Sequence, residues 1–361
     1  MADILNYDKK KDEQTMIQAD TGKRKKEQFI ENLREGDVVN DFFAVKIKNP
    51  PRSYKRGTWF GIVVTDKTGE INVKYWGGEN KERVKRLYDS FKIGDVVQVR
   101  LGNVEIYEEK PQISINETTG GIRRCGPNEY YVTDFIPSLE KEEIDELVKK
   151  IKENIKEVEN EQLKILLDAF FSDSDFLKDF AHSPSAMTHH HNYVGGNLEH
   201  TVGVVRLCKN IYEMYPGINK DLVITGAILH DIGKIKEYRA TAAIEKTDEG
   251  NFIGHIVMGD RWIREKISEI REKGKDFDVD LENKLCHIIL SHHGKYEFGS
   301  PRMPKTIEAM VVHQADMMDS QVKNFIQNIQ DGRKISEDDW AFIWDSDIGM
   351  KRSMYLVEEK A

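Results

Sequence analysis

The sequence has few of the features that mark secreted, membrane-spanning or disulfide-rich proteins. Its 361 residues include only three cysteines and nine prolines. Cys125, Cys208 and Cys286 lie far apart without a CxxC pair, which predicts buried free thiols rather than a disulfide framework or a zinc site. No stretch approaches the roughly 18 consecutive apolar residues of a membrane span, and residues 1–11 are too polar for a secretion signal. A soluble, cytoplasmic protein without a membrane partner is therefore expected.

The chain also has fewer basic than acidic residues. The chain has 54 Lys and Arg against 63 Asp and Glu, which gives a formal net charge of −9. This balance argues against a protein that coats nucleic acid through bulk positive charge, although a local basic groove is compatible with it. A chain of this length with 39% hydrophobic residues is long enough for two domains and a sizeable core.

Residues 1–32 are predicted to form a charged leader. Lys, Asp, Glu and Gln dominate this stretch, and it has few apolar side chains to bury. We favour a solvated, partly helical leader, and an RNA-binding arm built on the basic runs 9–11 and 23–26 is the alternative. Only the second interpretation predicts a salt-sensitive loss of affinity when the leader is removed.

Residues 33–120 change to short alternating segments, which predict a β-barrel. Five strands are expected, and the stretch 80–91 is expected to form a helix between the third and fourth. That order is typical of a five-stranded OB-fold barrel that binds nucleic acid. The expected strands are 37–47, 59–65, 70–76, 95–101 continuing through a bend into 104–107, and 112–116.

The second and third predicted strands divide their side chains between two faces. Alternating apolar residues from Phe60 to Val64 and from Ile71 to Tyr75 are expected to fill the barrel. On the other face, aromatic rings beside lysines can stack bases and hold the phosphates of a single strand. In the alternative interpretation the two tryptophans pack against the neighbouring domain. The candidate nucleic-acid-binding residues are Trp59, Lys74, Trp76, Arg52, Lys55 and Arg56.

The rest of the chain is predicted to be a linker, an all-α domain and an extension. Glycines and prolines mark residues 121–137 as the linker. From 138 to 335 apolar residues recur at helical spacing without sustained strand alternation, and Ser138 is the expected cap of the first helix. Residues 336–361 form a C-terminal extension with aromatic residues at 340, 342, 344 and 355. The expected fold class is multi-domain α+β.

The histidines point to the second domain as the place of the chemistry. All eleven lie between His182 and His313. His230 and Asp231 fall in the apolar helical run 222–235, where burial of an unpaired imidazole and carboxylate costs several kcal/mol each. A divalent metal would offset this cost, because a neutral imidazole and an ionised carboxylate are good ligands. Lys234 lies on the same side of the helix and suits a phosphate.

The histidines and aspartates of this segment fall on consecutive predicted helices in an order that resembles the HD-domain metal-dependent phosphohydrolases. The order is His200, His230 with Asp231, His255, His292 with His293, and Asp316. The string His-Asp-Ile-Gly-Lys at 230–234 is among the most specific signatures of that superfamily. The stretches 189–196, 254–259 and 292–301 are also similar to the YhaM-type 3′→5′ exoribonucleases, which carry an N-terminal OB domain. The resemblance covers most of residues 35–330.

The resemblance implies a metal-dependent 3′→5′ exonuclease that releases mononucleotides from single-stranded RNA, with DNA left open as a second substrate. Two divalent ions are implied, with manganese expected and Fe, Co or Zn as alternatives. His200, His230, Asp231 and Asp316 would hold the first ion. Asp231 would bridge to a second ion held by His255 and by His292, His293 or both, since helical spacing does not choose between the last two.

The implied catalytic residues are Asp231, Lys234 and His190. Lys234 would neutralise charge that builds on the phosphoryl oxygens. His190, or one of its neighbours at 189 and 191, would contact a phosphate or donate a proton to the leaving 3′-oxygen. A homo-oligomer is compatible with this activity, because a neighbouring subunit could complete the substrate channel.

Two other functions stay open at this stage. One is an HD phosphohydrolase of mononucleotides or cyclic dinucleotides whose barrel is regulatory, although Gly-Ser-Pro at 299–301, instead of Gly-Tyr-Pro, weakens the cyclic-dinucleotide version. The other is a non-enzymatic single-strand-binding adaptor. The complete set of metal-ligand positions argues against it, because a binding module would not need all of them. Stepwise release of mononucleotides from labelled RNA would reject both.

Overall fold

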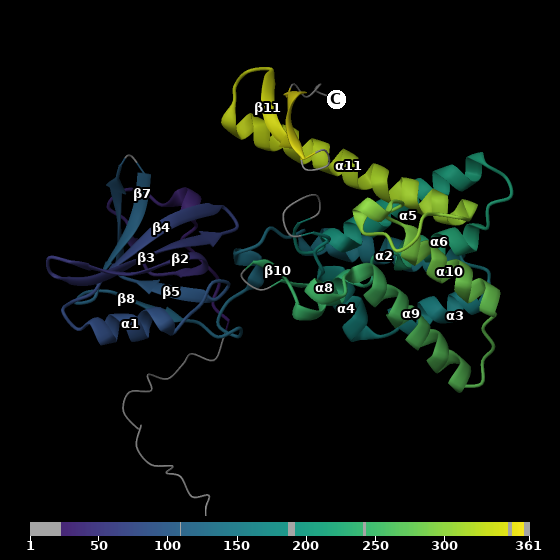
Figure 1. Cartoon of the computed structure of the whole chain (residues 1–361), viewed down its shortest axis with the longest axis horizontal. Helices are drawn as coiled ribbons and strands as arrows, with labels where there is room; N and C mark the ends of the chain where they lie inside the picture. The colour runs from purple at the N-terminus through teal and green to yellow at the C-terminus, as the bar shows by residue number, and fades with distance from the viewer. Residues whose placement is uncertain (1–22, 109, 187–191, 241–242, 346–348, 357–361) are drawn as a thin grey trace, which may run out of the picture.

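The computed structural model describes residues 23–108, 110–186, 192–240, 243–345 and 349–356. Figure 1 shows a strand-rich N-terminal body, a helical body, and a long final helix with a hairpin at its far end. Within the described ranges no helix is both long and apolar enough to cross a membrane. The prediction of a β-rich domain followed by a helical domain is confirmed.

The N-terminal body is a curled sheet of eight strands in the spatial order β1-β6-β7-β4-β3-β2-β5-β8. β4 pairs with β7 in parallel, and the other strand pairs of this sheet are antiparallel. The elements are η1 (Ile30–Asn32), β1 (Val38–Val39), β2 (Phe42–Tyr54), β3 (Gly57–Asp66), β4 (Gly69–Trp76), α1 (Lys81–Asp89), β5 (Val96–Arg100), β6 (Gly102–Tyr107), β7 (Lys110–Asn116) and β8 (Gly121–Arg124).

The predicted division of side chains in β3 and β4 is confirmed. On the opposite face Trp59 and Trp76 are cross-strand partners, with ring centroids 5.6 Å apart. The inward-facing residues are all buried, namely Phe60, Ile62, Val64, Ile71, Val73 and Tyr75.

The prediction of five strands is right in order and wrong in number. The first predicted strand is interrupted before Phe42, so β1 and β2 are separate. The fourth bends at Leu101, whose φ of 51° lies in the left-handed region, so β5 and β6 are separate as well. β8 is an additional strand that pairs with β5 and was assigned to the linker, because Gly121–Arg124 has only one apolar side chain besides its glycine.

The leader also differs from the expectation where the structure describes it. Lys26 is buried, and its Nζ donates a hydrogen bond to the Phe42 carbonyl at 2.7 Å and lies 3.5 Å from the Asp66 carboxylate. Its backbone N–H donates to Asp134 at 3.1 Å. A buried cation needs such partners, and these exist only on the folded barrel. Residues 24–32 are therefore part of the barrel body, and the prediction of a solvated leader is wrong for them.

The second body is built from helices around one large apolar core. The predicted helix start at Ser138 is wrong: α2 begins at Lys141, and the Glu143 side chain accepts a hydrogen bond from the Glu140 N–H at 2.9 Å. The helices are η2 (Val132–Asp134), α2 (Lys141–Glu157), α3 (Glu161–Phe171), α4 (Ser174–His182), α5 (Gly196–Met214), α6 (Lys220–Leu229), α7 (Lys234–Glu237), α8 (Asp248–Phe252), α9 (His255–Glu272), α10 (Val279–Ser291), η3 (Tyr296–Phe298) and α11 (Ile307–Ile335).

The all-α prediction for residues 138–335 is wrong at one place. β9 (Tyr238–Ala240) and β10 (Ile244–Lys246) form a two-stranded antiparallel hairpin between α7 and α8. Strands of three residues are too short to show an alternating pattern. The hairpin lies between the helical body and the barrel in Figure 1.

The hairpin contributes to a small apolar core that the two bodies share. Phe42, Ala44 and Val96 belong to this core from the barrel, and Val194 and Ile244 belong to it from the helical body. The segment between the bodies supplies the rest, namely Cys125, Tyr130, Phe135 and Ile136. Residues 121–137 are thus a packed connector rather than a free linker.

The C-terminal extension forms a second hairpin. β11 (Trp340–Asp345) and β12 (Met350–Tyr355) pair in an antiparallel register from Trp340 opposite Tyr355 to Asp345 opposite Met350. The hairpin packs on the last turns of α11, away from the helical body (Figure 1). We call the described part of residues 321–356 the arm.

Candidate metal centre and nucleic-acid face

The helical body brings the predicted metal ligands together in its interior. Helix α6 is buried on all sides, so the chain enters the core along it and places His230 and Asp231 at its end. His255 begins α9, and His292 follows directly after α10. Four helices and the turn after α6 therefore contribute to one buried polar cluster, which consists of His200, His230, Asp231, His255, His292, His293 and Asp316.

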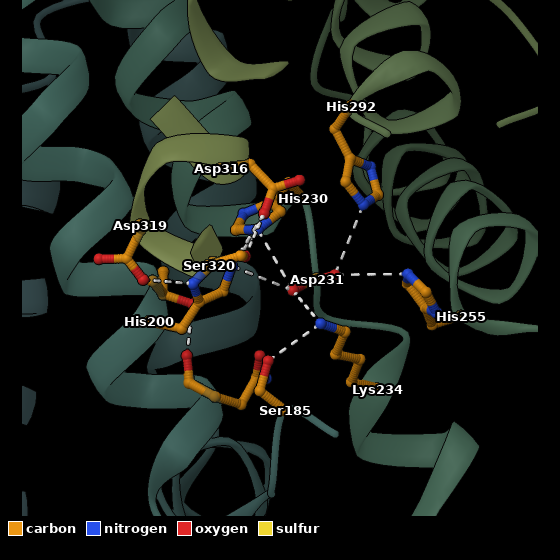
Figure 2. Close-up of polar contacts among 12 residues, drawn as sticks. Ser185, His200, His230, Asp231, Lys234, His255, His292, Asp316, Asp319 and Ser320 are labelled. Atoms are coloured by element: carbon orange, nitrogen blue, oxygen red, sulfur yellow. Dashed lines mark hydrogen bonds and ion pairs between the residues drawn. The ribbon is translucent and has the colours of Figure 1, made fainter. Parts of the chain in front are cut away.

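Asp231 lies at the centre of the cluster and faces two groups of histidines (Figure 2). Its Oδ2 atom is 3.3 Å from His230 Nε2 and 3.5 Å from His200 Nε2. Its Oδ1 atom is 3.5 Å from the Nε2 atoms of both His255 and His292. One carboxylate thus joins two potential ligand sets.

Each ligand set has further members. Asp316 Oδ1 lies 3.2 Å from His200 Nε2, on the side of the first set. His293 lies with His255 and His292 in a group whose ligand atoms are all within 4.8 Å of one another. His292 and His293, between which the sequence left the choice open, therefore both lie beside the second set, and His292 is fully buried.

The second ring nitrogens of the histidines are held by hydrogen bonds. His230 Nδ1 donates to the Ala227 carbonyl and His292 Nδ1 to the Ile289 carbonyl, each at 2.7 Å. His293 Nδ1 donates to the Phe298 carbonyl at 2.9 Å. In the neutral ring this arrangement leaves the Nε2 lone pair free for a cation.

Two carboxylates hold the remaining histidines, and the sequence did not single out either of them. Asp319 Oδ2 lies 2.7 Å from His200 Nδ1, and Glu237 Oε2 lies 2.6 Å from His255 Nδ1. Such outer carboxylates fix the orientation of a metal-binding imidazole and raise its basicity. Asp319 follows Asp316 by three residues on α11, and this spacing is the signal by which it could have been found.

The electrostatics keep the carboxylates ionised. Burial opposes ionisation of Asp231, but the Lys234 ammonium and the His230 ring hold the pKa of its carboxyl well below the usual range. Burial likewise opposes ionisation of Asp316, and hydrogen bonding with His200 nevertheless lowers its pKa. Both groups are therefore anionic ligands at neutral pH.

The histidines differ in their pKa. Burial lowers the pKa of His255 and His292, and it lowers the pKa of His293 to about 4. Burial acts in the same direction on His200, but Asp316 and Asp319 raise its pKa to about 9. The second set is thus made of neutral imidazoles, whereas His200 must lose a proton when a cation binds.

The donor set fits divalent metal ions. Asp231 Oδ1, His255 Nε2 and His292 Nε2 are buried, converge on one point, and have no hydrogen-bond partner among the described residues. Buried polar atoms without partners cost free energy that a bound cation would recover. An HD-type site of imidazoles and carboxylates accordingly depends on a divalent metal, and mixed nitrogen and oxygen donors suit Mn, Fe, Co or Zn.

Lys234 contacts Asp231 directly. Its Nζ lies 2.6 Å from Asp231 Oδ2 and donates a hydrogen bond to Ser185 Oγ at 3.0 Å. It lines a cavity of about 410 Å³. The cavity is lined by Ser185, Lys234, Tyr238, His255, His293, Phe298, Asp316, Met317, Ser320 and Gln321. His190, the third predicted catalytic residue, lies outside the described residues.

The predicted nucleic-acid-binding residues lie on the barrel. Trp59 and Lys74 line a cavity of about 420 Å³ whose other lining residues also belong to the barrel. The Lys74 ammonium lies 3.8 Å from the centre of the Tyr107 ring. Trp76 packs edge-on against Tyr54 and donates a hydrogen bond to Ser114 Oγ at 3.0 Å. Neither tryptophan therefore needs the helical body as a packing partner.

The basic residues of the first hairpin lie beside this face. Arg52 is in β2 opposite Trp59 and lines a second cavity, of about 320 Å³, with Lys81 and Lys85 of α1. Lys55 and Arg56 are exposed in the turn between β2 and β3. The barrel therefore has an aromatic groove with cations on its flank.

Two family models match the chain. One is described as an HD domain and covers residues 197–320, and the other is described as an OB-fold nucleic acid binding domain and covers residues 44–119. Together with the histidine and aspartate cluster, these matches define an HD-class metal-dependent hydrolase joined to an OB-fold domain.

The curated relatives narrow this class to one family. A 3′-5′ exoribonuclease YhaM from Listeria innocua is 31% identical over 287 residues, which cover 79% of this chain and 86% of the relative. Proteins of the same name from Listeria welshimeri and Oceanobacillus iheyensis are each 30% identical, and each match covers 82% of this chain and 89% of the relative. The chain belongs to the YhaM family of 3′-5′ exoribonucleases, which are hydrolytic nucleases of the HD superfamily.

Some solved structures align with part of this chain. The OB domain of Ta0387 from Thermoplasma acidophilum aligns with 32% of this chain and 94% of its own, at 13% identity and a TM-score of 0.23.

Proposed function

We propose that the chain removes mononucleotides one at a time from the 3′ end of single-stranded RNA, and that it also accepts single-stranded DNA. The barrel holds the strand and the helical body cuts it. The observation that supports this most directly is the position of Asp231, whose two oxygens face two separate groups of imidazoles. Family membership supplies the direction of the reaction.

Two divalent ions occupy the cluster in this proposal. His200, His230, Asp231 and Asp316 would hold one, and Asp231, His255, His292 and His293 would hold the other. Bound ions of this kind activate a water near neutral pH and stabilise charge on phosphoryl oxygens. Manganese is the proposed metal, because its ligand preferences match imidazoles mixed with carboxylates and the family resemblance favours it.

The other lining residues position the scissile phosphate. Lys234 holds Asp231 ionised and presents its ammonium to the cavity beside Ser185, where it attracts a phosphoryl oxygen. Phe298 and Tyr238 supply the aromatic side of the same cavity, against which the terminal base can stack. A histidine of the 189–191 run, His190 in our proposal, protonates the leaving 3′-oxygen.

The barrel contributes affinity rather than chemistry. Trp59 and Trp76 stack bases of the incoming strand, while Lys74, Arg52, Lys55 and Arg56 contact its phosphates. Trp59 and Lys74 line the same barrel cavity, which brings an aromatic ring and a cation together. We therefore expect binding and hydrolysis to be separable by mutation.

One assay tests this function. RNA and DNA single strands labelled at the 5′ end are incubated with the protein, with and without manganese and a chelator. A ladder that shortens by one nucleotide from the 3′ end of RNA, and that the chelator abolishes, is the expected result. Products cut internally, or release from the 5′ end, would contradict the proposal.

Asp231→Asn supplies the matched variant for this assay. The amide keeps the shape of the carboxylate but removes the charge that both ligand sets use, so hydrolysis should fall by at least about 10³-fold. RNA affinity should stay nearly unchanged, because the barrel is distant from the substitution in the fold. Asp168→Asn, at an exposed position of α3, serves as the control. Full activity of Asp231→Asn would eliminate the proposed metal site.

A further inference from the structure

The arm carries a row of aromatic side chains that the proposed nuclease activity does not use. Trp340, Phe342 and Trp344 alternate along β11, and they are 60%, 72% and 56% exposed. Tyr355 stands opposite Trp340 on β12, with ring centroids 5.0 Å apart. We call Trp340, Phe342, Trp344 and Tyr355 the aromatic row.

The opposite face of this hairpin already has its packing partner. Ile343, Met354 and Leu356 are buried together, and a Cβ atom on Gly332 of α11 would lie 2.4 Å from Ile343 and 2.8 Å from Leu356. Arg333 of α11 donates a hydrogen bond to the Leu356 carbonyl at 2.8 Å. The hairpin is therefore fixed on α11 by one face, and the aromatic row remains on the other.

The size of the aromatic row is that of an interface. Aromatic side chains bury about 150–250 Å² each when covered, so four of them that are each about half exposed or more leave roughly 400–500 Å² of apolar surface per chain. This value lies within the range for the largest apolar patch on a typical monomer, about 300–600 Å², and patches of that size are often functional. Two chains that each cover such a patch bury enough area for a specific contact of about 1,200 Å² when flanking residues are added.

A complementary surface exists on the same chain. Leu207 of α5 and Met318, Val322 and Ile326 of α11 line an apolar groove of about 480 Å³. The three α11 residues recur at spacings of four, which places them on one side of the helix, and each is about half exposed. The groove between α5 and α11 is concave, whereas the hairpin protrudes from the end of α11. The two apolar surfaces are therefore complementary in shape.

The charges around the two surfaces are also complementary. Arg206, Lys323 and Asp319 belong to the lining of the groove. Lys323 pairs with Glu199 and Asp319 with His200, so Arg206 is the basic residue that the groove offers to a partner. Glu337, Asp338 and Asp339 are exposed directly before the aromatic row begins. This acidic stretch lies at the Trp340 end of the row and favours a surface with basic residues at its edge, whereas Lys351 of β12 stands opposite Trp344 at the other end.

We propose that two copies of this chain pair through their arms, with the hairpin of each copy seated in the α5–α11 groove of the other. Both surfaces are built on α11, and Val322 and Gly332 are separated along it by about 15 Å. Two α11 helices that run antiparallel about a two-fold axis therefore place each hairpin beside the partner's groove. Such a contact is isologous and closes on itself as a dimer.

The test is the mass of the full chain in solution, measured by sedimentation over a range of concentrations. The unmodified chain should sediment at twice its 41.8 kDa. Phe342→Asp on the hairpin and Val322→Asp on the groove should each weaken the dimer by roughly tenfold or more, because each places a charge in the apolar contact. Arg206→Glu should also weaken it, and Asp338→Lys in the same chain should restore it in part.

Val279→Asp is the matched control, since Val279 is an exposed apolar residue at the start of α10, outside both surfaces. The helical content of every variant, measured by circular dichroism, separates loss of pairing from loss of folding. A chain that sediments as a monomer, an assembly with an odd number of copies, or a dimer unaffected by both aspartate variants would overturn the proposal. Loss of RNA affinity in Phe342→Asp with an unchanged dimer would assign the aromatic row to nucleic acid instead and would equally overturn it.

Discussion

Glu237 shows how a residue that holds no metal can control one. Its carboxylate is 2.6 Å from His255 Nδ1 and 2.9 Å from the Lys246 ammonium, so it connects the second ligand set to the β9–β10 hairpin. Burial raises the pKa of Glu237, but hydrogen bonds from His255 and Lys246 lower it to about 2. The carboxylate is therefore charged at neutral pH and keeps the Nε2 atom of His255 directed at Asp231.

Glu237→Gln should weaken metal binding without removing a ligand. The amide cannot supply the charge that orients His255, so we expect the manganese concentration for half-maximal activity to rise by about 10–100-fold. Activity at saturating metal should be largely recovered. Manganese titrations of the hydrolysis rate provide the measurement.

Glu249→Gln, an exposed residue on the neighbouring α8, is the control for this substitution. A Glu237→Gln variant with an unchanged metal requirement would mean that His255 is oriented by packing alone.

The members of the polar cluster could be predicted from the sequence, but their outer partners could not. His200, His230, Asp231 and Asp316 each lie in or beside a helix, and the helical pattern together with the family signature located them. Glu237 and Asp319 acquire their roles only through the packing of α7 on α9 and of α11 on α5. Nothing in local periodicity encodes these contacts, because they depend on how distant helices pack.

At the scale of elements, the approach of α7 to α9 depends on a glycine. A Cβ atom on Gly233 would lie 2.0 Å from the carbonyl oxygen of His255 and 2.7 Å from its carbonyl carbon. Backbone atoms cannot turn aside as a flexible side chain can. Gly233 therefore lets α7 approach α9 closely enough for the His255 ring to lie beside the Asp231 carboxylate.

Gly233→Ala should separate α7 from α9 and disturb the second ligand set. We expect destabilisation of about 1–3 kcal/mol from the forced overlap, together with a loss of activity larger than the loss of folded protein explains. Thermal unfolding and manganese-dependent hydrolysis are the two measurements.

Gly259→Ala is the matched control on the other side of the same contact. A Cβ atom there would meet its nearest neighbour, the Gly233 amide nitrogen, at an ordinary 3.5 Å. Equal behaviour of the two variants would show that close approach at Gly233 is not required.

The aromatic face formed by β3 and β4 gives a second prediction at this scale. Replacement of both Trp59 and Trp76 by alanine should lower the affinity for single-stranded RNA by about 10–100-fold, because stacking contributes roughly 1–3 kcal/mol per base. The rate at saturating substrate should change little. Fluorescence titration with labelled RNA measures the affinity.

Tyr131→Ala is the control, since Tyr131 is an exposed aromatic residue outside the barrel cavities. Unchanged RNA affinity in the double tryptophan variant would remove base stacking from the role of this face.

Elements were predicted well where their pattern is long and poorly where it is short. The alternation of β3 and β4 and the long helices of the second body are found at nearly the expected positions. β8 and the β9–β10 hairpin were missed because three or four residues cannot establish a period of two. Their positions are determined by tertiary pairing, with β5 in one case and within the shared core in the other.

At the scale of the whole molecule, the shared core between the two bodies should make them unfold together. Phe135 of the connector is buried against Tyr130, with the rings edge to face and their centroids 5.3 Å apart. Calorimetry of the full chain should therefore show one transition rather than two. Phe135→Ala should destabilise this transition by about 3–5 kcal/mol.

Phe252→Ala serves as the control, since Phe252 is 89% exposed. Fluorescence of variants that keep only Trp59 or only Trp262 can follow the barrel and the helical body separately. Two transitions at different temperatures in the unmodified chain would show that the shared core does not couple them.

Helix α11 has a consequence that depends on its stiffness. Its 29 residues form one continuous rod of about 43 Å that carries Asp316 and Asp319 in its first half and the hairpin at its end. A rod of this kind acts as a lever, so a tilt imposed at the hairpin moves the carboxylates that hold and orient His200. A displacement of about 1 Å at a reacting centre can lower the rate by about 10²-fold. A contact that holds the hairpin in place therefore also limits how far the carboxylates of the metal site can move.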